Sequence, residues 1–354
     1  MVKQKIKIDS FDIAKGIFAV MMMYAHSLHG YKEAFFYGIG SNWALLPLYV
    51  FDKVMCAGSI PMMCIICGYG FRKKTMRKAV EGQLKYTWKP YLIVALAVAV
   101  GTVVKKLLIR ESVLEGLRFS ALPFLFGFCP EGIFLGLEMN TIGPVWFVVM
   151  YVVSGIMLNA VLQEERTWVQ LCLVIIGACA GMLMRGMTIP FCLRQSLICT
   201  LYMYIGWLMK KNKYFETEIP LYFRITVTVG FMIASLGTSY DVAINAWGNG
   251  MTDVLIGAFG GVVLLRLFLR FNRFEGQLAN SVRWLGRNVM PLCCVHGAMY
   301  VLLPLHRLYP VYADRPGIGI LIQLFIYLVT GIGGCFAVDR LKAALRGRKQ
   351  EAIV

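Results

Sequence analysis

The sequence contains repeated apolar runs of about 20 residues, and this feature restricts the chain to very few folds. A helix of that length crosses the hydrocarbon core of a bilayer. The composition agrees, since 58% of the 354 residues are hydrophobic and only 16% are charged, against about a quarter in a soluble domain. A backbone in lipid must satisfy its own hydrogen bonds. We therefore expect an all-α integral membrane protein with one membrane domain over residues 1–354 and no soluble appended domain.

The apolar runs predict about ten transmembrane helices. They lie near residues 11–28, 44–70, 91–109, 142–162, 168–186, 190–209, 218–238, 251–270, 289–308 and 317–338. Counted from a cytoplasmic N-terminus, the outer loops contain only four basic residues, Lys32, Arg110, Arg118 and Arg315, while the inner segments contain most of the others. This asymmetry is typical of the positive-inside rule. It predicts that both termini are cytoplasmic and that the chain is a multi-pass protein of the plasma or inner membrane.

The positions of the basic residues and of the cysteines argue against nucleic-acid binding and against a metal site. The formal net charge is +17, but the basic residues follow the membrane topology, so we expect a lipid bilayer and no nucleic acid as the partner. The 11 cysteines lie mostly within apolar runs. Neither the Cys64–Cys67 pair nor the Cys293–Cys294 pair has a second pair or a nearby histidine at zinc spacing. We interpret the cysteines as small buried hydrophobes and expect no metal site.

The first apolar run, "FDIAKGIFAVMMMYAHSLHG", contains polar residues that are costly inside a bilayer. Asp12 lies three residues before Lys15, a spacing that permits an ion pair. Lys15 and His26 are eleven residues apart, which puts them on one helix face about 16 Å apart along the axis. His29 is either a second titrating group or an interfacial residue. The stripe predicts a lined cavity or pathway, with Lys15 toward the cytoplasm and His26 in the outer half.

Other interpretations of this helix stay open. A lysine can extend to the interface, and His26 can be a hydrogen-bonded packing residue. A basic start before an apolar run is also typical of a signal peptide, with "AHS" as a faint cleavage site. Lys15 would interrupt the apolar core of such a peptide, so we expect a retained helix.

The chain contains no nucleophile elbow, HExxH zinc motif or P-loop. A histidine, however, suits general-base chemistry.

Two connecting segments are candidates for function. The inner segment from Phe71 to Tyr91 carries seven basic residues, which fit either an anionic lipid surface or a polyanionic cytoplasmic ligand. The outer segment from Arg110 to Thr141 is long and contains Pro123, Pro130, Glu131 and Glu138. It fits a lid over an outer site or a plain loop.

The first helix resembles that of the acyltransferase-3 family of integral membrane acyltransferases. The family carries a basic residue, ten intervening residues and a histidine, which Lys15 and His26 match, with lysine replacing the commoner arginine. Asp12 matches the acidic residue that usually precedes the basic one. The segment "CGYGFRKKTMRK…WKPYL" resembles the family's segment after the second helix, although Cys67 replaces the usual serine. Its matching residues are Phe71, Arg72, Lys73, Lys74, Pro90 and Tyr91.

Later segments extend the resemblance over nearly the whole chain. "IGPVWFVVMYV" resembles a family segment through Gly143, Pro144, Trp146 and Phe147. "LGRNVMPLCCVHG" resembles another through Gly286 and His296, although Met290 to Val295 is unusual. The outer "YDVAINAWGN", residues 240–249, resembles the carbohydrate O-acetylase branch.

The resemblance implies an acyl-CoA-dependent O-acyltransferase that acts on a hydroxyl of an envelope carbohydrate or its lipid-linked precursor. The acyl group expected first is acetyl, and a longer acyl group is the alternative. It implies His26 as the catalytic base, with Lys15 stabilising negative charge within the path or meeting the donor. It also places Asp12, the acidic residue before Lys15, in the catalytic set. The expected donor-binding residues, which would hold the CoA phosphates, are Arg72, Lys73, Lys74 and Arg77. No cofactor is expected to be bound, and acyl-CoA is a co-substrate.

Further residues are candidates for the acceptor side, and other classes of protein stay open. Trp146 is expected to shape the cavity and His296 to line it, while Asp241, Asn245 and Asn249 would bond sugar hydroxyls or cap their loop. The main alternative is a polytopic transporter or glycan exporter that uses the Lys/His stripe as a substrate path. A membrane sensor or scaffold is a third class, but the sequence provides no output domain for it. Transport without acyl-CoA consumption would favour the transporter.

Overall fold

The structure is a helical bundle with very little β-structure. The computed structural model describes residues 6–28, 46–129, 131–303, 305, 308–312 and 314–351. Its helices are α1 (Asp12–Leu28), α3 (Leu46–Gly70), α4 (Met76–Gln83), α5 (Lys89–Leu108), α6 (Val113–Phe126), α7 (Trp146–Val161), α8 (Thr167–Leu183), α9 (Leu193–Lys211), α10 (Leu221–Leu236), α11 (Met251–Leu269), α12 (Gln277–Arg287), α13 (Val289–Leu302), α14 (Leu308–Val311) and α15 (Pro316–Glu351). The expectation of an all-α membrane protein is confirmed at this level.

A helix overlaps each of the ten predicted transmembrane segments. Five helical segments of the described part are long and apolar enough to cross a membrane, namely Tyr49–Gly70, Met76–Leu108, Gly143–Val161, Met251–Arg273 and Pro316–Arg340. Three shorter apolar helices are Thr167–Leu183, Leu221–Leu236 and Val289–Leu302. The number of crossings and the side on which the termini lie stay predictions.

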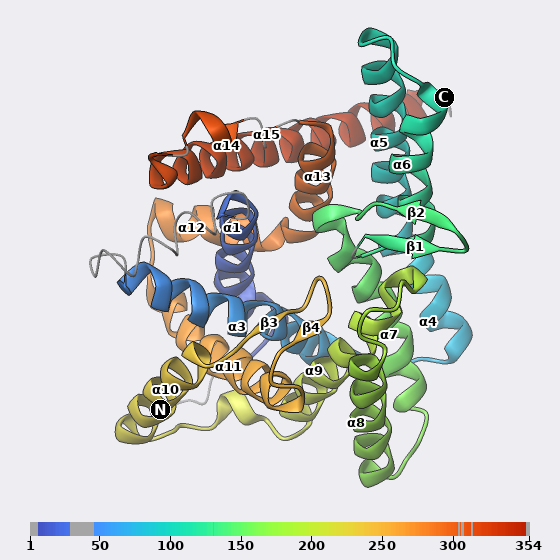
Figure 1. Ribbon diagram of the computed structural model, residues 1–354. Coiled ribbons are helices and arrows are strands. Elements are labelled where there is room, and N and C mark those ends of the chain that lie inside the picture. Colours follow the sequence, from blue (N-terminus) through green and yellow to red (C-terminus); the bar gives the residue numbers. More distant parts are fainter. Residues whose placement is uncertain are drawn as a thin grey trace.

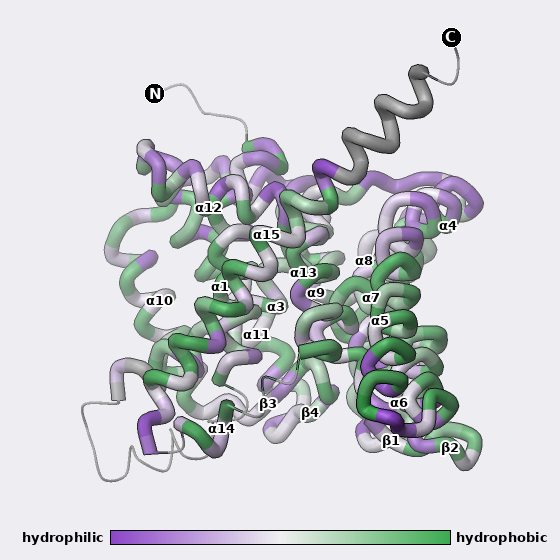
Figure 2. The backbone as a smooth tube through the Cα atoms, turned by 90° about the horizontal axis from the view of Figure 1, so that it is seen from above, coloured by the Kyte–Doolittle hydropathy of each residue, from purple (hydrophilic) through white to green (hydrophobic). Residues whose placement is uncertain are grey.

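The segments predicted for opposite membrane faces lie at opposite ends of the bundle (Figure 2). The basic helices α4 and α12 lie at one end, which we call the basic end. Helix α6, the hairpin of β1 (Gly132–Phe134) and β2 (Leu137–Met139), and the hairpin of β3 (Tyr240–Asp241) and β4 (Ala246–Trp247) lie at the other. Both hairpins are antiparallel. The outer segment at 110–141 is therefore a helix and a hairpin, and the inner segment at 71–91 is largely helical.

Helix α3 packs against both α9 and α11, and α7 packs against α9; Figure 1 shows α3, α9 and α11 side by side. The crossing of α3 and α9 is close because glycines face backbone atoms of the opposite helix. A Cβ on Gly68 would lie 1.8 Å from the Met203 carbonyl oxygen, and a Cβ on Gly206 would lie 2.0 Å from that of Ile65. Small residues allow this approach between membrane helices. The crossing fixes α3, which contributes to both cavities described below.

Glycines facing the backbone of a neighbouring helix also position α1, which carries the polar stripe. A Cβ on Gly16 would lie 2.0 Å from the Val282 carbonyl oxygen of α12, and a Cβ on Gly286 would lie 1.8 Å from the Asp12 carbonyl oxygen. Two reciprocal backbone contacts therefore hold the basic end of α1 against α12. Gly286 is one of the residues that carried the family resemblance, and its place in the fold is this contact.

Candidate active site

Two histidines from distant parts of the chain form a pair in the bundle. His26 Nδ1 on α1 and His296 Nε2 on α13 are 2.9 Å apart, at hydrogen-bond distance. His296 is buried, with 1% of its surface exposed. The Tyr327 ring from α15 meets the His296 ring edge-on, with centroids 4.5 Å apart. Tyr300 lies 5.3 Å from His26 by ring centroids. His296 therefore sits in a buried, aromatic environment, whereas His26 is half-buried. Burial on the His296 side strengthens the hydrogen bond between them.

His26 opens onto a cavity of about 340 Å³, which we call the outer cavity. Trp146 at the start of α7 and Asp241 of the β3–β4 hairpin also line it, as the sequence predicted for cavity residues. Its further lining residues include Tyr24, Tyr49, Asp52, Lys53 and Thr238. His296 does not line this cavity but lies behind His26. An apolar cavity wall with a few polar groups is typical of a small-ligand site.

Asp52 and Lys53 are site residues that the sequence analysis missed. Asp52 on α3 is buried at 5% exposure and accepts a hydrogen bond from Cys56 Sγ at 3.4 Å. Lys53 Nζ donates to the Thr238 carbonyl oxygen at 3.0 Å, which ties α3 to the loop before β3. The available signal was a charged pair inside the apolar run at 44–70, since such residues mark functional sites in membranes.

Lys15 lies in a different cavity from His26. Its Nζ is 2.6 Å from Asp12 Oδ1, which is the ion pair that the spacing permits. Lys15 lines a cavity of about 460 Å³ at the basic end of the bundle, which we call the inner cavity. Arg72 and Lys74 line the inner cavity too, so two of the four predicted donor-binding residues meet the first-helix lysine there.

The other two predicted donor residues point elsewhere. Arg77 on α4 is exposed and pairs with Glu81 at 2.8 Å one turn further along the same helix. Lys73 is exposed and does not line the inner cavity. The donor role of both residues stays a prediction, and the cavity geometry favours Arg72 and Lys74.

Asn159 holds the basic segment in place, and the sequence analysis missed it. Its side chain accepts a hydrogen bond from the Lys74 backbone N–H at 2.9 Å and donates one to the Lys74 carbonyl oxygen at 3.0 Å. Gln163 donates a second bond to the same carbonyl at 3.0 Å. Asn159 is fully buried on α7. A buried polar side chain of this kind must be hydrogen-bonded, and an asparagine within an apolar helix was the only signal for it.

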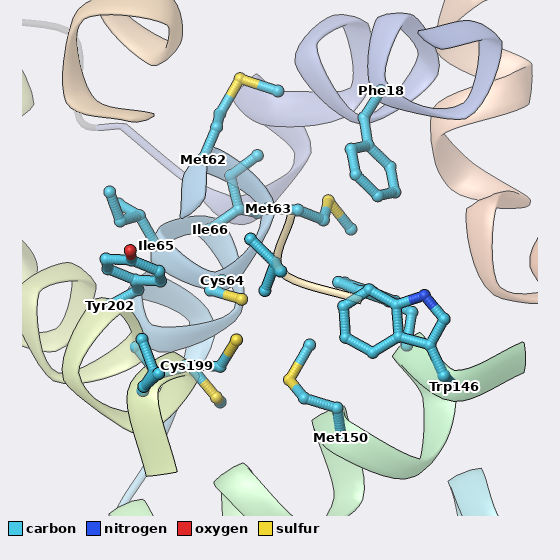
Figure 3. Close-up of a cluster of buried hydrophobic side chains, with 14 of the residues drawn as sticks. Phe18, Met62, Met63, Cys64, Ile65, Ile66, Trp146, Met150, Cys199 and Tyr202 are labelled. Atoms are coloured by element: carbon cyan, nitrogen blue, oxygen red, sulfur yellow. The ribbon is translucent and has the colours of Figure 1, made fainter. Parts of the chain in front are cut away.

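An apolar layer lies between the inner and outer cavities. Phe18 follows Lys15 by one helical turn on α1, and its ring packs on Phe147 of α7 with centroids 5.4 Å apart. Met63 of α3 lines the inner cavity, whereas Phe18 and Phe147 line the outer one. All three belong to one buried cluster with Trp146, and Figure 3 shows the Met63 side chain between Phe18 and Trp146. Among the described residues, none lines both cavities.

The predicted acceptor residues differ in what they contact. Asn245 is buried and in the left-handed region, with φ of 55°. Its Nδ2 donates to the Gly181 carbonyl oxygen and its Oδ1 accepts from Trp247 Nε1, both at 2.9 Å. Asn249 Nδ2 donates to the Gly237 carbonyl oxygen at 2.8 Å. These bonds favour the loop-capping interpretation of both asparagines. Asp241 lines the outer cavity, and its Oδ1 also caps the hairpin loop by accepting the Ala243 backbone N–H at 2.8 Å.

Two remaining expectations concern His29 and a metal site. His29 lies outside the described residues. Within the described part of the chain, no group of three or more His, Cys, Asp or Glu side chains could hold a metal ion.

The comparisons with known proteins point to one family. The family model described as an acyltransferase domain, that of the acyltransferase-3 family, matches residues 8–340. No curated protein and no solved structure matches the chain. The matched range includes α1 to α14 and most of α15, and so contains both cavities and the histidine pair.

Proposed function

Because the chain belongs to the acyltransferase-3 family, we propose that this multi-pass membrane acyltransferase transfers an acyl group, acetyl first, from acyl-CoA to a hydroxyl of an envelope carbohydrate or its lipid-linked precursor. The observation that carries the proposal is the arrangement on α1. One helix carries a cation that lines the inner cavity and a histidine that lines the outer cavity. This arrangement suits an anionic donor on one side and a neutral hydroxyl acceptor on the other.

The reaction assigns the proton transfer to His26. The acceptor hydroxyl oxygen attacks the thioester carbonyl carbon, the C–S bond breaks, and CoA leaves as the thiolate. His26 takes the hydroxyl proton during attack and returns it to the sulfur, so the enzyme ends in its starting protonation state. Since His26 Nδ1 is engaged with His296, the base is Nε2 of His26.

His296 determines which tautomer His26 adopts. For His26 Nε2 to accept a proton, its Nδ1 must carry hydrogen and donate to His296 Nε2. His296 then carries its own hydrogen on Nδ1, a buried atom for which no described residue offers a hydrogen-bond partner. When His26 becomes charged, its Nδ1–H bond to His296 becomes charge-assisted and strengthens. His296 is therefore a positioning residue that acts through His26.

The inner cavity suits the phosphates of CoA. Arg72 and Lys74 supply two cations in one cavity with Lys15, and Asn159 fixes the backbone of the basic segment. Lys15 is itself compensated by Asp12, so it contributes a dipolar pair rather than a bare charge. The thioester end of the donor must then pass the apolar layer at Phe18 and Phe147 to reach His26.

The decisive experiment measures label transfer by the purified protein. The protein in nanodiscs receives acetyl-CoA labelled in the acetyl group together with a crude envelope-glycan extract. We expect glycan-dependent release of free CoA and label in the glycan fraction. Movement of glycan across proteoliposomes with no CoA release would contradict the proposal and favour the transporter class.

The inner-cavity cations provide a prediction about donor binding. Replacing both Arg72 and Lys74 by glutamine is expected to raise the KM for acyl-CoA by about 100-fold or more, because each of the two charge-assisted bonds to a phosphate contributes about 1.5–3 kcal/mol. The turnover number should change little. Steady-state kinetics with varied acyl-CoA measures both. The matched control is Arg77→Gln, which removes a charge from the same segment but outside the cavity. Equal effects of control and double variant would contradict the assignment.

The histidine pair provides a second prediction. His296→Phe is expected to lower kcat about 10- to 100-fold with little change in either KM, since a hydrogen bond to a charged group contributes about 1.5–3 kcal/mol. His296→Gln should recover most of the loss, because its amide oxygen can accept the His26 Nδ1–H bond. Paired measurement of kcat and thermal unfolding separates the roles. If His296→Gln is as slow as His296→Phe and equally unstable, His296 is only a packing residue.

A further inference from the structure

An apolar groove runs along α10 at the edge of the bundle. It has a volume of about 350 Å³ and lies between α9, α10 and α11. Phe223 and Val227 of α10 and Phe259 and Val262 of α11 supply much of its wall. Figures 1 and 2 place α10 at the periphery, and its outward side chains are large and apolar, for example Ile225 and Ile233. The groove therefore faces the hydrocarbon of the bilayer.

At the basic end the groove meets a polar cavity of about 870 Å³. Ile219, Arg224, Arg266 and Arg270 line both spaces, so an apolar surface continues directly into a cationic one. The polar cavity has five arginines in its wall, Arg224, Arg266, Arg270, Arg273 and Arg283, against two carboxylates, those of Asp9 and Glu218. This is a concentrated excess of positive charge beside an acyl-chain-sized groove.

The fold accounts for two of these arginines but not for the others. Arg266 donates to the Tyr214 carbonyl oxygen at 2.6 Å and to that of Thr217 at 3.2 Å. Arg283 donates to the carbonyl oxygens of Asn272 and Phe274. Arg224 makes no such bond, and its Nε is buried without a partner among the described residues.

Three of these arginines also lack an ion-pair partner for their positive charge within the described part of the chain. None of the ion pairs formed within the described ranges includes Arg224, Arg270 or Arg273. Arg224 lies in the first turn of α10, where a positive charge opposes the helix dipole. An anion at this place would be stabilised by the arginines and by the helix N-terminus together.

We infer that this groove and cavity form a binding site for an anionic phospholipid of the leaflet at the basic end. The phosphate lies among Arg224, Arg266 and Arg270, and one acyl chain lies in the groove against Phe223 and Phe259. The continuity of the two spaces selects a lipid over a soluble phosphate compound, which would use the arginines but not the groove. The site is separate from the inner cavity, with which it shares no lining residue, and the inference does not depend on the acyltransferase activity.

Native mass spectrometry of the purified full-length chain tests the inference. The protein is incubated in detergent with equal amounts of phosphatidylglycerol and phosphatidylcholine of the same chain length. We expect one phosphatidylglycerol to be retained in preference to phosphatidylcholine. Arg224→Gln combined with Arg270→Gln should reduce this preference at least tenfold, since neither side chain holds the fold through a bond described above. The matched control Arg287→Gln removes an exposed charge from α12 outside both spaces and should retain the preference.

A second variant tests the acyl-chain part and guards against misfolding. Thr228→Trp fills the groove but leaves every arginine in place, and we expect it to lose phosphatidylglycerol retention as well. Retention by either variant at the wild-type level would overturn the inference. Displacement of the lipid by excess free CoA would also overturn it, because the arginines would then bind a soluble phosphate compound.

Discussion

His26→Ala is expected to lower the turnover of acyl transfer by about 100- to 10,000-fold, the range that a general base contributes. Alanine removes the nitrogen that accepts the hydroxyl proton and also the hydrogen-bond partner of His296 Nε2. The KM for acyl-CoA should stay near the wild-type value, because the inner cavity contains no atom of His26. Initial rates of CoA release at saturating acceptor, measured on the nanodisc protein, test this expectation.

Two comparisons make the His26 result interpretable. Met21→Ala shortens another side chain of α1 that lines the same cavity and should leave turnover within about tenfold, because it removes packing and no proton acceptor. Thermal unfolding of both variants reports on folding. Wild-type turnover by a folded His26→Ala protein would exclude His26 as the base and would return the histidine pair to a packing role.

Gly286→Val is expected to cause the largest loss of folded protein. The new Cβ would start 1.8 Å from the Asp12 carbonyl oxygen, a backbone atom, so α1 and α12 must separate. Overpacking of a tight contact costs about 1–3 kcal/mol, and more where backbone must move. Asp12 and Lys15 lie at this contact, so the surviving protein should also bind donor poorly.

The control for this prediction is a glycine in open space. Gly333 on α15 has no atom within 4 Å of the position that a Cβ would take, and Gly333→Val makes the identical chemical change. Fluorescence-detected size exclusion and the unfolding temperature compare the two. Equal yields and equal unfolding temperatures would show that the α1–α12 crossing can open without loss, contrary to the expectation.

The sequence predicted the features of the site that depend on a single helix. The Asp12–Lys15 ion pair follows from a three-residue spacing, and the placement of Lys15 and His26 at two levels follows from the rise of a helix. The apolar runs likewise predicted where helices would form. The match over residues 8–340 confirms the family that the first helix and the basic segment resembled.

The sequence could not predict contacts between elements far apart in the chain. The 2.9 Å approach of His26 to His296 depends on the rotation of α13, whose polar positions were too few to identify a face. The Asn159 bonds to the Lys74 backbone depend on how α7 meets the basic segment. For the segment at 110–141 the sequence indicated only a lid or a plain loop. In the structure α6 begins after the Ser112 N-cap and ends at Gly127 with φ of 61°, and Gly136 at φ of 76° lies in the hairpin turn.

The apolar layer between the cavities has a consequence for proton leakage across the membrane in which the protein lies. A continuous file of water between Lys15 and His26 would conduct protons and dissipate the membrane potential. Phe18, Met63 and Phe147 interrupt such a file, because each is buried in one packed cluster and apolar surface excludes water. The described residues thus place titratable groups at two depths with packed apolar side chains between them, which is the arrangement of an insulating layer.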